Sequence, residues 1–425
     1  MSVRAGILVT GTEVITARIT DRNGPWVSQR LAGLGVEVAH ILVVADRPDD
    51  LEAGLRFMAD EGCDLIVTSG GLGPTADDLT AEVVARFAGV EMVLDEGMEA
   101  KIARIIAGFA RRLRFDPAAL QAANRKQAMV PRGAETIDPA GTAPGLVVAV
   151  EDGPTVVVLP GPPRELHAMW EPALATTAVR EVLEAAEEYV VQTVRLFGIP
   201  ESEIAKSLRE IGSEVDLDPL EITTCLRRGE LEVDVRHRPG AEDARERLVH
   251  GIVERHRPFV FSLDGSRIDD QIAELLGGHM IALAESCTAG QLAARIAEPP
   301  GASAYLAGGV VAYSNDAKSE LLGVPAELIA EHGAVSPEVA EAMADGAIDR
   351  FGADLGVGVT GIAGPDGGTK AKPVGYVCIC VRSSSGQTLA RDPVIPGDRV
   401  EIKDRAGTLA MHLLRRLLRG EELPA

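Results

Sequence analysis

The stretch Asp64-Leu-Ile-Val-Thr-Ser-Gly-Gly-Leu-Gly-Pro74 begins as a short apolar run and ends in glycines and a proline. A run of this length, bounded in this way, is typical of a fully buried strand in a parallel sheet. Helical patterns flank it at Asp49–Asp60, which opens with acidic residues, and at Leu79–Phe87. The stretch therefore predicts an α/β layer with a glycine-rich loop at the carboxyl end of a central strand.

The same alternation continues through residues 1–170, which we expect to form the first domain. The predicted strands are Ala5–Thr10, Val36–Val44, Asp64–Ser69 and Thr155–Leu159, and a further helix is predicted at Gly24–Leu34. Strands that alternate with helices favour a parallel sheet covered by helices, with ligands at the carboxyl ends of its strands.

Two more domains are predicted downstream. Residues 171–262 contain strands at 189–197, 220–227 and 230–236, helices at 201–210 and 241–253, and an extended end at 258–262, which indicates a small α+β module. Residues 267–425 return to the α/β pattern, with helices at 268–276, 289–297 and 337–351 and strands at 280–284, 308–313, 355–360 and 375–381. The fold class is thus multidomain α/β.

Composition excludes several function classes. The 425 residues carry a net charge of −22, which argues against nonspecific binding to nucleic acid. The basic residues Arg111, Arg112 and Arg114 are expected to form an exposed helix face. Five irregularly spaced cysteines do not suggest a disulfide framework or a zinc site. No signal peptide or membrane span is recognisable, so a cytoplasmic protein is expected.

The segment Ala284-Glu-Ser-Cys-Thr-Ala-Gly290 lies where a predicted strand meets a predicted helix. A serine at such a corner could attack a carbonyl while unpaired helical N–H groups stabilise the oxyanion. On this segment alone, the simpler interpretation is that Ser286 or Thr288 caps the helix, because Thr288 and Gln291 fit a capping box. Cys287 is a rival nucleophile, but cysteine in such a place is more often a buried thiol.

Two further segments favour catalysis. Tyr313 and Lys318 follow the predicted strand, so both could emerge at one sheet edge, and a desolvated lysine can activate a serine where no histidine is supplied. The glycine-rich loop 360–368 follows another strand, where it could let a phosphate or carboxamide approach the backbone. Taken alone, this loop is equally well an ordinary turn.

In the first domain, Gly70, Gly71 and Gly73 lie between a strand and a helix, where backbone N–H groups can bind a pyrophosphate. Asp77 and Asp78 could then hold a divalent cation that bridges the phosphates. The alternative is that Thr75, Asp77 and Asp78 only cap the helix and complement its dipole, and the residues alone favour this alternative.

The third domain closely resembles the C-terminal amidase domain of the CinA family of competence/damage-inducible proteins. The resemblance rests on 284–290 (AESCTAG), 308–315 (GGVVAYSN) with Lys318, 321–324 (LLGV), 333–336 (GAVS), 358–368 (GVTGIAGPDGG) and 372–375 (KPVG). It implies a metal-free nicotinamide-nucleotide amidase in which Ser286 is the nucleophile, Lys318 the base, and Tyr313 and Thr360 supporting groups. It also implies substrate contacts at Thr288, Gly290, Gly361 and Gly364, and a phosphate contact at Arg399. Ala289 stands where many members have glycine.

The first domain resembles the N-terminal domain of the same family, which has the fold of molybdopterin-binding proteins. The matching stretches are 11–13 with 21–23, 69–80, 124–131 and 159–165. The resemblance implies a pyrophosphatase that uses magnesium, manganese or cobalt to convert ADP-ribose into AMP and ribose 5-phosphate. Asn23 and Thr75 join the three glycines as expected substrate contacts, and Glu13 joins Asp77 and Asp78 as an expected metal ligand. Ala17 replaces a glycine usual in the family.

The whole chain is therefore predicted to be a bifunctional hydrolase that recycles breakdown products of NAD, with nicotinamide mononucleotide and ADP-ribose as substrates. The middle module resembles the small KH-like insert of the family, and the family implies a homodimer. Two alternatives stay open: a molybdopterin adenylyltransferase-like reaction in the first domain, and a non-catalytic nucleotide- or molybdopterin-binding protein related to competence. No nucleic-acid or membrane partner is expected.

Overall fold

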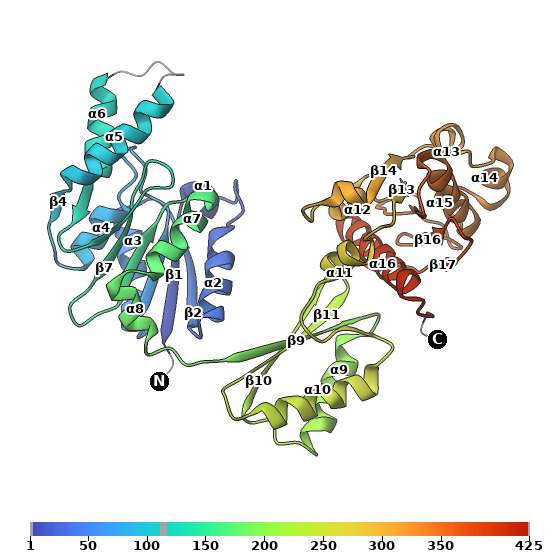
Figure 1. Cartoon of the computed structure of the whole chain (residues 1–425), viewed down its shortest axis with the longest axis horizontal. Helices are drawn as coiled ribbons and strands as arrows, with labels where there is room; N and C mark the ends of the chain where they lie inside the picture. Colours follow the sequence, from blue (N-terminus) through green and yellow to red (C-terminus); the bar gives the residue numbers. More distant parts are fainter. Residues whose placement is uncertain (1–2, 111–116, 424–425) are drawn as a thin grey trace. The chain divides into compact units, whose positions relative to one another are not determined.

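The computed structural model describes residues 3–110 and 117–423, which form two compact units that meet at Tyr189 and Val190 (Figure 1). The multidomain α/β class predicted from the sequence is confirmed, with a mixed sheet in the first unit and two further sheets in the second. The predicted helix face with Arg111, Arg112 and Arg114 lies outside the described residues.

The first unit is built on a six-stranded sheet in the order β2-β1-β3-β8-β7-β6. Its first four strands are parallel, whereas β7 and β6 are antiparallel additions at one edge. The sheet strands are β1 (Arg4–Thr10), β2 (Glu37–Val44), β3 (Leu65–Ser69), β6 (Glu135–Ile137), β7 (Gly145–Ala149) and β8 (Thr155–Leu159), and a separate ribbon pairs β4 (Met92–Leu94) with β5 (Met129–Pro131). The parallel sheet expected from the alternation is therefore a mixed one.

Helices cover both faces of this sheet, as Figure 1 shows. Helices α2 (Asn23–Gly33), α7 (Pro163–Leu174) and α8 (Thr177–Leu183) pack on one face, and α3 (Pro48–Asp60) and α4 (Thr80–Phe87) pack on the other. The remaining helices are α1 (Thr12–Ile15), α5 (Glu96–Ala110) and α6 (Pro117–Gln127). The first domain does not end at 170 as predicted, because Val179 of α8 is buried in its core.

The second unit begins with the middle module, a four-stranded antiparallel sheet in the order β10-β11-β9-β12. Its strands are β9 (Val190–Phe197), β10 (Leu220–Arg227), β11 (Glu230–His237) and β12 (Val260–Ser262). Helices α9 (Glu201–Gly212) and α10 (Glu242–His256) bury their apolar residues against one face of the sheet. The predicted strands at 220–227 and 230–236 form a hairpin, and both residues of its turn, Arg228 and Gly229, have positive φ.

The rest of the second unit is a five-stranded sheet in the order β14-β13-β15-β16-β17, in which β14, β13 and β15 are parallel and the last two strands antiparallel. The strands are β13 (Ile281–Glu285), β14 (Leu306–Val311), β15 (Leu355–Gly361), β16 (Val377–Ser383) and β17 (Thr388–Arg391). The helices are α11 (Ile268–Leu275), α12 (Gln291–Ile296), α13 (Asn315–Leu322), α14 (Ala326–His332), α15 (Pro337–Phe351) and α16 (Arg399–Arg419), with a short 3₁₀ turn at Ala302–Ala304. The sequence analysis predicted no element after residue 381 and therefore missed α16, which has 21 residues.

Close contact between α15 and β15 explains part of the high glycine content. A Cβ atom on Gly358 would lie 2.9 Å from the backbone nitrogen of Ala344 and still closer to the carbonyl oxygen of Ala340. Helix and sheet can approach to this distance only where the strand carries no side chain. Gly407 in the middle of α16 is the opposite case, because nothing lies within 4 Å of its missing Cβ.

We therefore expect Gly358→Ala and Gly407→Ala to have opposite effects on stability. Overpacking at residue 358 should lower the free energy of unfolding by about 1–3 kcal/mol. At residue 407 the gain in helix propensity should raise it by roughly 0.5–1 kcal/mol. Thermal unfolding of the purified variants followed by far-UV circular dichroism measures both shifts. A Gly358→Ala protein that unfolds at the wild-type temperature would mean that α15 and β15 are further apart than described.

Candidate active site

The predicted nucleophile Ser286 directly follows β13, at the carboxyl end of a buried strand. Its backbone N–H donates to the carbonyl oxygen of Val359 on β15 over 2.8 Å, so its main chain is fixed by the neighbouring strand. The residue is only 7% exposed. The serine is thus held rigidly at the sheet edge, as a nucleophile requires.

Lys318 lies beside it, although the two residues are 32 positions apart in the sequence. Helix α13 carries the lysine and is capped by Ser314, whose hydroxyl accepts the N–H of Ala317 over 3.1 Å. The Lys318 Nζ atom is 3.1 Å from Ser286 Oγ and 3.1 Å from the carbonyl oxygen of Ala312, with the carbonyl of Tyr313 at 3.4 Å. The side chain is 2% exposed. The structure therefore brings together the two residues on which the predicted chemistry depends.

Burial lowers the pKa of Lys318, because the charged ammonium loses water, and none of its described hydrogen-bond partners is a carboxylate. A neutral amine has two N–H donors and one lone pair. Its two donors match the two backbone carbonyls, and the lone pair is then available to the serine hydroxyl. The surroundings of Lys318 suit a general base, and among its described contacts none is an acid that would keep it protonated.

The rival nucleophile Cys287 is in a different environment. Its side chain is buried, and loss of solvent raises the pKa of the thiol to about 12. The thiolate is the reactive form of cysteine, so this thiol is inert at neutral pH. Cys287 belongs to the core, as the simpler interpretation of the sequence predicted.

Glu285 caps the helix after the corner, a role that the sequence reading did not assign. Its carboxylate, 1% exposed, accepts the backbone N–H groups of Gly290, Leu292 and Ala293 over 2.8–3.1 Å. These N–H groups are therefore not available to an oxyanion, contrary to our expectation. The sequence feature that could have indicated this capping role is an acidic residue at the end of an apolar strand, followed by a helix within a few residues.

The capping box predicted for Thr288 and Gln291 is wrong. The Gln291 N–H donates to the backbone carbonyl of Thr288, and the helix is preceded by Gly290 in the left-handed conformation at φ 91°. The Thr288 hydroxyl is buried and has no hydrogen-bond partner among the described residues. Ala289 also has a positive φ of 53°, which explains why glycine suits this position, and the same holds for Ala17 at 56°.

Tyr313 and Arg399 form the exposed side of the site. The Arg399 guanidinium donates from Nη2 to the Tyr313 hydroxyl over 2.8 Å and from Nη1 to the carbonyl of Gly364 over 2.7 Å. Arg399 is the first residue of α16, and a capping box formed by Asp398 and Glu401 fixes the start of that helix. Both side chains are exposed and can meet a ligand.

The other predicted residues of this site lie close by and have mainly structural partners. The buried hydroxyl of Thr360 donates to the carbonyl of Ala334 over 2.7 Å and so ties the 333–336 loop to β15. A Cβ atom on Gly361 would lie 3.0 Å from the Cys287 sulfur, and Gly364 contributes the carbonyl that accepts Arg399. Of these three, only Gly364 touches an exposed polar group that could meet substrate.

The first unit has a separate pocket of about 370 Å³ at the carboxyl ends of its parallel strands. Its lining contains Gly70, Gly71 and Gly73 as predicted, with Glu13, Asp77 and Asp78. It also contains Asp46, Gln127 and Glu165, which the sequence reading did not assign. Burial raises the pKa of Glu165, so this carboxyl group holds a proton more tightly than usual. The topology thus gathers residues from five separate segments at one sheet edge.

Asn23 lines a neighbouring cavity of about 460 Å³, which shares Thr10, Glu13, Gly161 and Pro162 with this pocket. Its side-chain amide donates to Ser69 Oγ over 2.8 Å and to the Gly161 carbonyl over 2.7 Å. Gly70 and Gly71 both have positive φ, and Thr80 Oγ1 donates to the Gly70 carbonyl over 2.9 Å. These bonds fix the glycine loop against the end of β8 through the Asn23 amide nitrogen, whereas Asn23 Oδ1 has no hydrogen-bond partner among the described residues.

The predicted metal ligands Glu13, Asp77 and Asp78 line one pocket but do not form a preformed three-carboxylate set. In residues 3–110 and 117–423 no three acidic, histidine or cysteine side chains lie close enough to hold a metal ion. Asp78 accepts the backbone N–H of Thr75 over 2.9 Å. The hydroxyl of Thr75 lowers the pKa of Asp77, which keeps this exposed carboxyl ionised. Magnesium commonly takes one or two carboxylates and completes its shell with substrate phosphates, and Asp77 with Asp78 fits that mode.

Comparisons with known proteins agree with this division of the chain. A model of the "CinA C-terminal domain" matches residues 266–418, and a model of a "probable molybdopterin binding domain" matches residues 6–180. A CinA-like protein of Mycobacterium sp. (strain JLS) is 59% identical, over 98% of this chain and 99% of that protein. The chain belongs to the CinA family. A second CinA-like protein, from Mycolicibacterium gilvum, is 58% identical over 99% of this chain and 100% of its own length.

One solved CinA structure covers a part of the chain. It is the competence/damage-inducible protein of Agrobacterium tumefaciens, which is 37% identical, has a TM-score of 0.35, and covers 37% of this chain and 99% of its own. The described part of this CinA-family chain has no helix that is both long and apolar enough to cross a membrane.

Substitution of Glu285 tests its capping role. Glu285→Gln keeps one carbonyl oxygen but loses the charge and the second acceptor, so at least one buried N–H is left without a good partner. We expect the free energy of unfolding to fall by about 1–3 kcal/mol. Glu320→Gln, an exposed change on α13, is the control and should shift it by less than about 0.5 kcal/mol. Equal denaturant midpoints for the two variants would contradict this role.

Proposed function

We propose that the C-terminal domain of this CinA-family chain hydrolyses the carboxamide of nicotinamide mononucleotide to nicotinic acid mononucleotide and ammonia. The observation that carries the proposal is the buried contact of 3.1 Å between Lys318 Nζ and Ser286 Oγ. A serine paired with an uncharged lysine is an established arrangement for acyl transfer. The cationic pyridinium of this substrate withdraws electrons from its carboxamide and so favours attack.

The reaction proceeds in two halves. Ser286 Oγ attacks the carboxamide carbon while its proton passes to Lys318 Nζ, which gives a tetrahedral intermediate. The C–N bond then breaks, Lys318 returns the proton to the leaving nitrogen, and ammonia departs from an acyl ester on Ser286. In the second half a water molecule gives a proton to Lys318 and attacks the ester, and Ser286 Oγ recovers the proton as nicotinic acid mononucleotide leaves.

The oxyanion of both intermediates needs donors close to Ser286. Glu285 already binds the N–H groups at the start of α12. The N–H groups of Ser286 and Ala289 donate to the carbonyls of Val359 and Ser286. The N–H groups of Cys287 and Thr288 donate to no backbone carbonyl of the described residues, and we assign the oxyanion to these two donors.

Arg399 is suited to the nucleotide phosphate. It stands at the first position of a long helix, where the helix dipole and the arginine charge both favour an anion. Its contact with the Tyr313 hydroxyl supports a phosphate site on the exposed side of the Ser286–Lys318 pair. The net negative charge of the chain does not prevent phosphate binding by Arg399, because the arginine and the helix start would act on the phosphate locally.

The first unit supports a second proposal, the hydrolysis of ADP-ribose to AMP and ribose 5-phosphate. The supporting observation is the pocket of about 370 Å³ in which three loop glycines face ionisable carboxyl groups. Backbone N–H groups of the loop would bind the pyrophosphate, and Asp77 with Asp78 would hold a divalent cation that neutralises its charge. A molybdopterin-binding role is the competing interpretation, because the same region matches that family model.

Substitutions and pH together test the amidase. Lys318→Met and Ser286→Ala should each lower kcat for ammonia release from nicotinamide mononucleotide by about 10³-fold or more, with EDTA present throughout. Because Lys318 must be neutral to act, wild-type kcat should fall as the pH drops through its lowered pKa and should reach a plateau above it. A folded wild-type protein that releases no ammonia would contradict the proposal.

Asp77→Asn tests the first unit. Loss of this ionised carboxylate should lower metal-dependent AMP release from ADP-ribose by roughly a hundredfold, whereas Asp60→Asn, an exposed change on α3, should have no effect. The measurement is AMP formation with and without magnesium, manganese or cobalt. Tight molybdopterin binding by wild type without ADP-ribose turnover would favour the competing interpretation.

A further inference from the structure

Helix α16 connects the middle module to the proposed amidase site. Its first residue, Arg399, contacts the Tyr313 hydroxyl and the Gly364 carbonyl. Its later turns lie against β9, β11 and the β10–β11 turn of the middle module. A contact that fixes the position of α16 along its axis therefore also fixes the position of Arg399.

The β10–β11 turn contacts α16 close to Arg399. Arg228 in this turn pairs with Asp404 over 3.4 Å, and the stem of Arg405 lies against Gly229. Arg405 also donates to the Pro396 carbonyl over 3.1 Å, just before the helix begins. Residues 404 and 405 follow Arg399 by about one and a half helical turns, or roughly 8 Å. The turn thus holds the segment of the helix that carries the phosphate-binding residue.

A buried polar pair anchors the helix further along. His412 Nε2 donates to the Glu230 carboxylate over 2.7 Å, and these residues are 3% and 6% exposed. The imidazole also stacks on Phe197 of β9, with ring centres 3.8 Å apart and planes 7° from parallel. Burial lowers the pKa of His412, which favours the neutral imidazole as the donor in this contact. A directional contact of this kind fixes one register, because a shift of the helix would leave a buried polar group without a partner.

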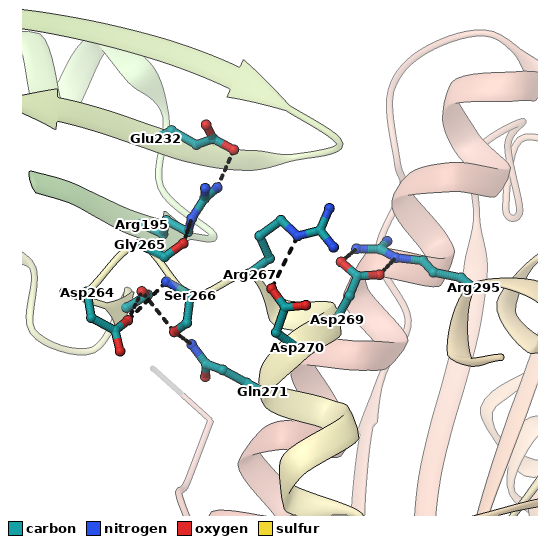
Figure 2. A network of polar contacts seen from close by, with 11 residues as sticks. Arg195, Glu232, Asp264, Gly265, Ser266, Arg267, Asp269, Asp270, Gln271 and Arg295 are labelled. Carbon is teal, nitrogen blue, oxygen red and sulfur yellow. Dashed lines mark hydrogen bonds and ion pairs between the residues drawn. The ribbon is translucent and has the colours of Figure 1, made fainter. Parts of the chain in front are cut away.

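The connection between the module and α11 is also fixed to α16, as Figure 2 shows in part. Arg195 of β9 pairs with Glu232 and donates to the Gly265 carbonyl over 2.9 Å. Gln271 of α11 donates to the Ser266 hydroxyl over 2.8 Å and accepts from Arg415 of α16 over 2.9 Å. The connecting residues 263–267 are therefore held by hydrogen bonds from β9 and from α11.

Arg295 adds another contact to the same helix. Figure 2 shows its two-pronged bond to Asp269 of α11. Its remaining nitrogen donates to the Thr408 hydroxyl of α16 over 2.7 Å. Polar contacts from the middle module, α11 and α12 thus reach α16 at residues 404, 408, 412 and 415.

We propose that the middle module is a positioning element for the amidase site. Through Glu230 and the β10–β11 turn, it holds α16 in the register that places Arg399 beside the Tyr313 hydroxyl. The inference rests on the proposed function for the role of Arg399 in phosphate binding. Glu230 and His412 touch no reacting atom and act only through the helix.

A double-mutant cycle separates this role from a general loss of stability. Glu230→Ala leaves the His412 N–H buried without a partner and should raise KM for nicotinamide mononucleotide about tenfold, with kcat changed less than about twofold. In an Arg399→Ala background the same substitution should raise KM less than about twofold, because the Arg399 side chain that it would displace is already absent. Glu230→Gln, which keeps an acceptor, should restore KM to near the wild-type value.

The matched control is Ser207→Ala. Ser207 in α9 contacts the buried ring of His256 over 2.7 Å, so this variant also removes the partner of a buried histidine of the middle module. It should leave KM unchanged. Equal rises of KM for Glu230→Ala in both backgrounds, or a rise of the same size for Ser207→Ala, would overturn the inference.

Hydrogen exchange gives a readout that does not need turnover. In the full chain, Glu230→Ala should speed exchange of the amides of residues 400–404 by about tenfold, while Ser207→Ala leaves them unchanged. If wild type releases no ammonia, the proposed function fails, yet faster exchange still shows that the module positions α16. Unchanged exchange in Glu230→Ala would overturn the positioning role itself, whatever the activity.

Discussion

The burial of Lys318 without a carboxylate partner is the constraint around which the C-terminal domain is organised. An isolated ammonium in such a place loses the stabilisation of water, which lowers the pKa of Lys318 and favours the neutral amine. The partners that the structure supplies are two backbone carbonyls and one serine hydroxyl. A core that only needed to be stable would carry an apolar side chain there, and the retained lysine is best explained by the chemistry of Ser286.

Close packing is what allows this pair to form. β13 lies between β14 and β15 in its sheet and ends at the serine, while the glycines of β15 let α15 approach the sheet. Glu285 then turns the chain from strand into helix by binding three N–H groups. The corner is therefore held from the sheet, from the helix and from α13, so Ser286 and Lys318 need little reorganisation to react.

The sequence predicted most central strands because each is a short apolar run between turn residues, and β8 was predicted to the residue. It missed β7 and could not show that β16 runs antiparallel, since a buried strand has the same pattern in either direction. The residues suggested that Lys318 could activate Ser286 and the family resemblance assigned both roles, whereas the segment 284–290 alone left helix capping as the better interpretation. The Glu230–His412 contact stayed hidden because a hydrogen bond between distant segments leaves no local pattern, whereas the capping by Glu285 had a local signal that the prediction did not use.

The central claim is that Ser286, and not Cys287, is the nucleophile and that neutral Lys318 activates it. The most direct test is labelling by a sulfonyl fluoride across a pH series, with the modified residue located by mass spectrometry. The account predicts a label on Ser286 in wild type, at a rate that falls as the pH drops through the lowered pKa of Lys318, and almost no label in Lys318→Met. A label on Cys287, or equal labelling of Ser286 in wild type and Lys318→Met, would contradict it.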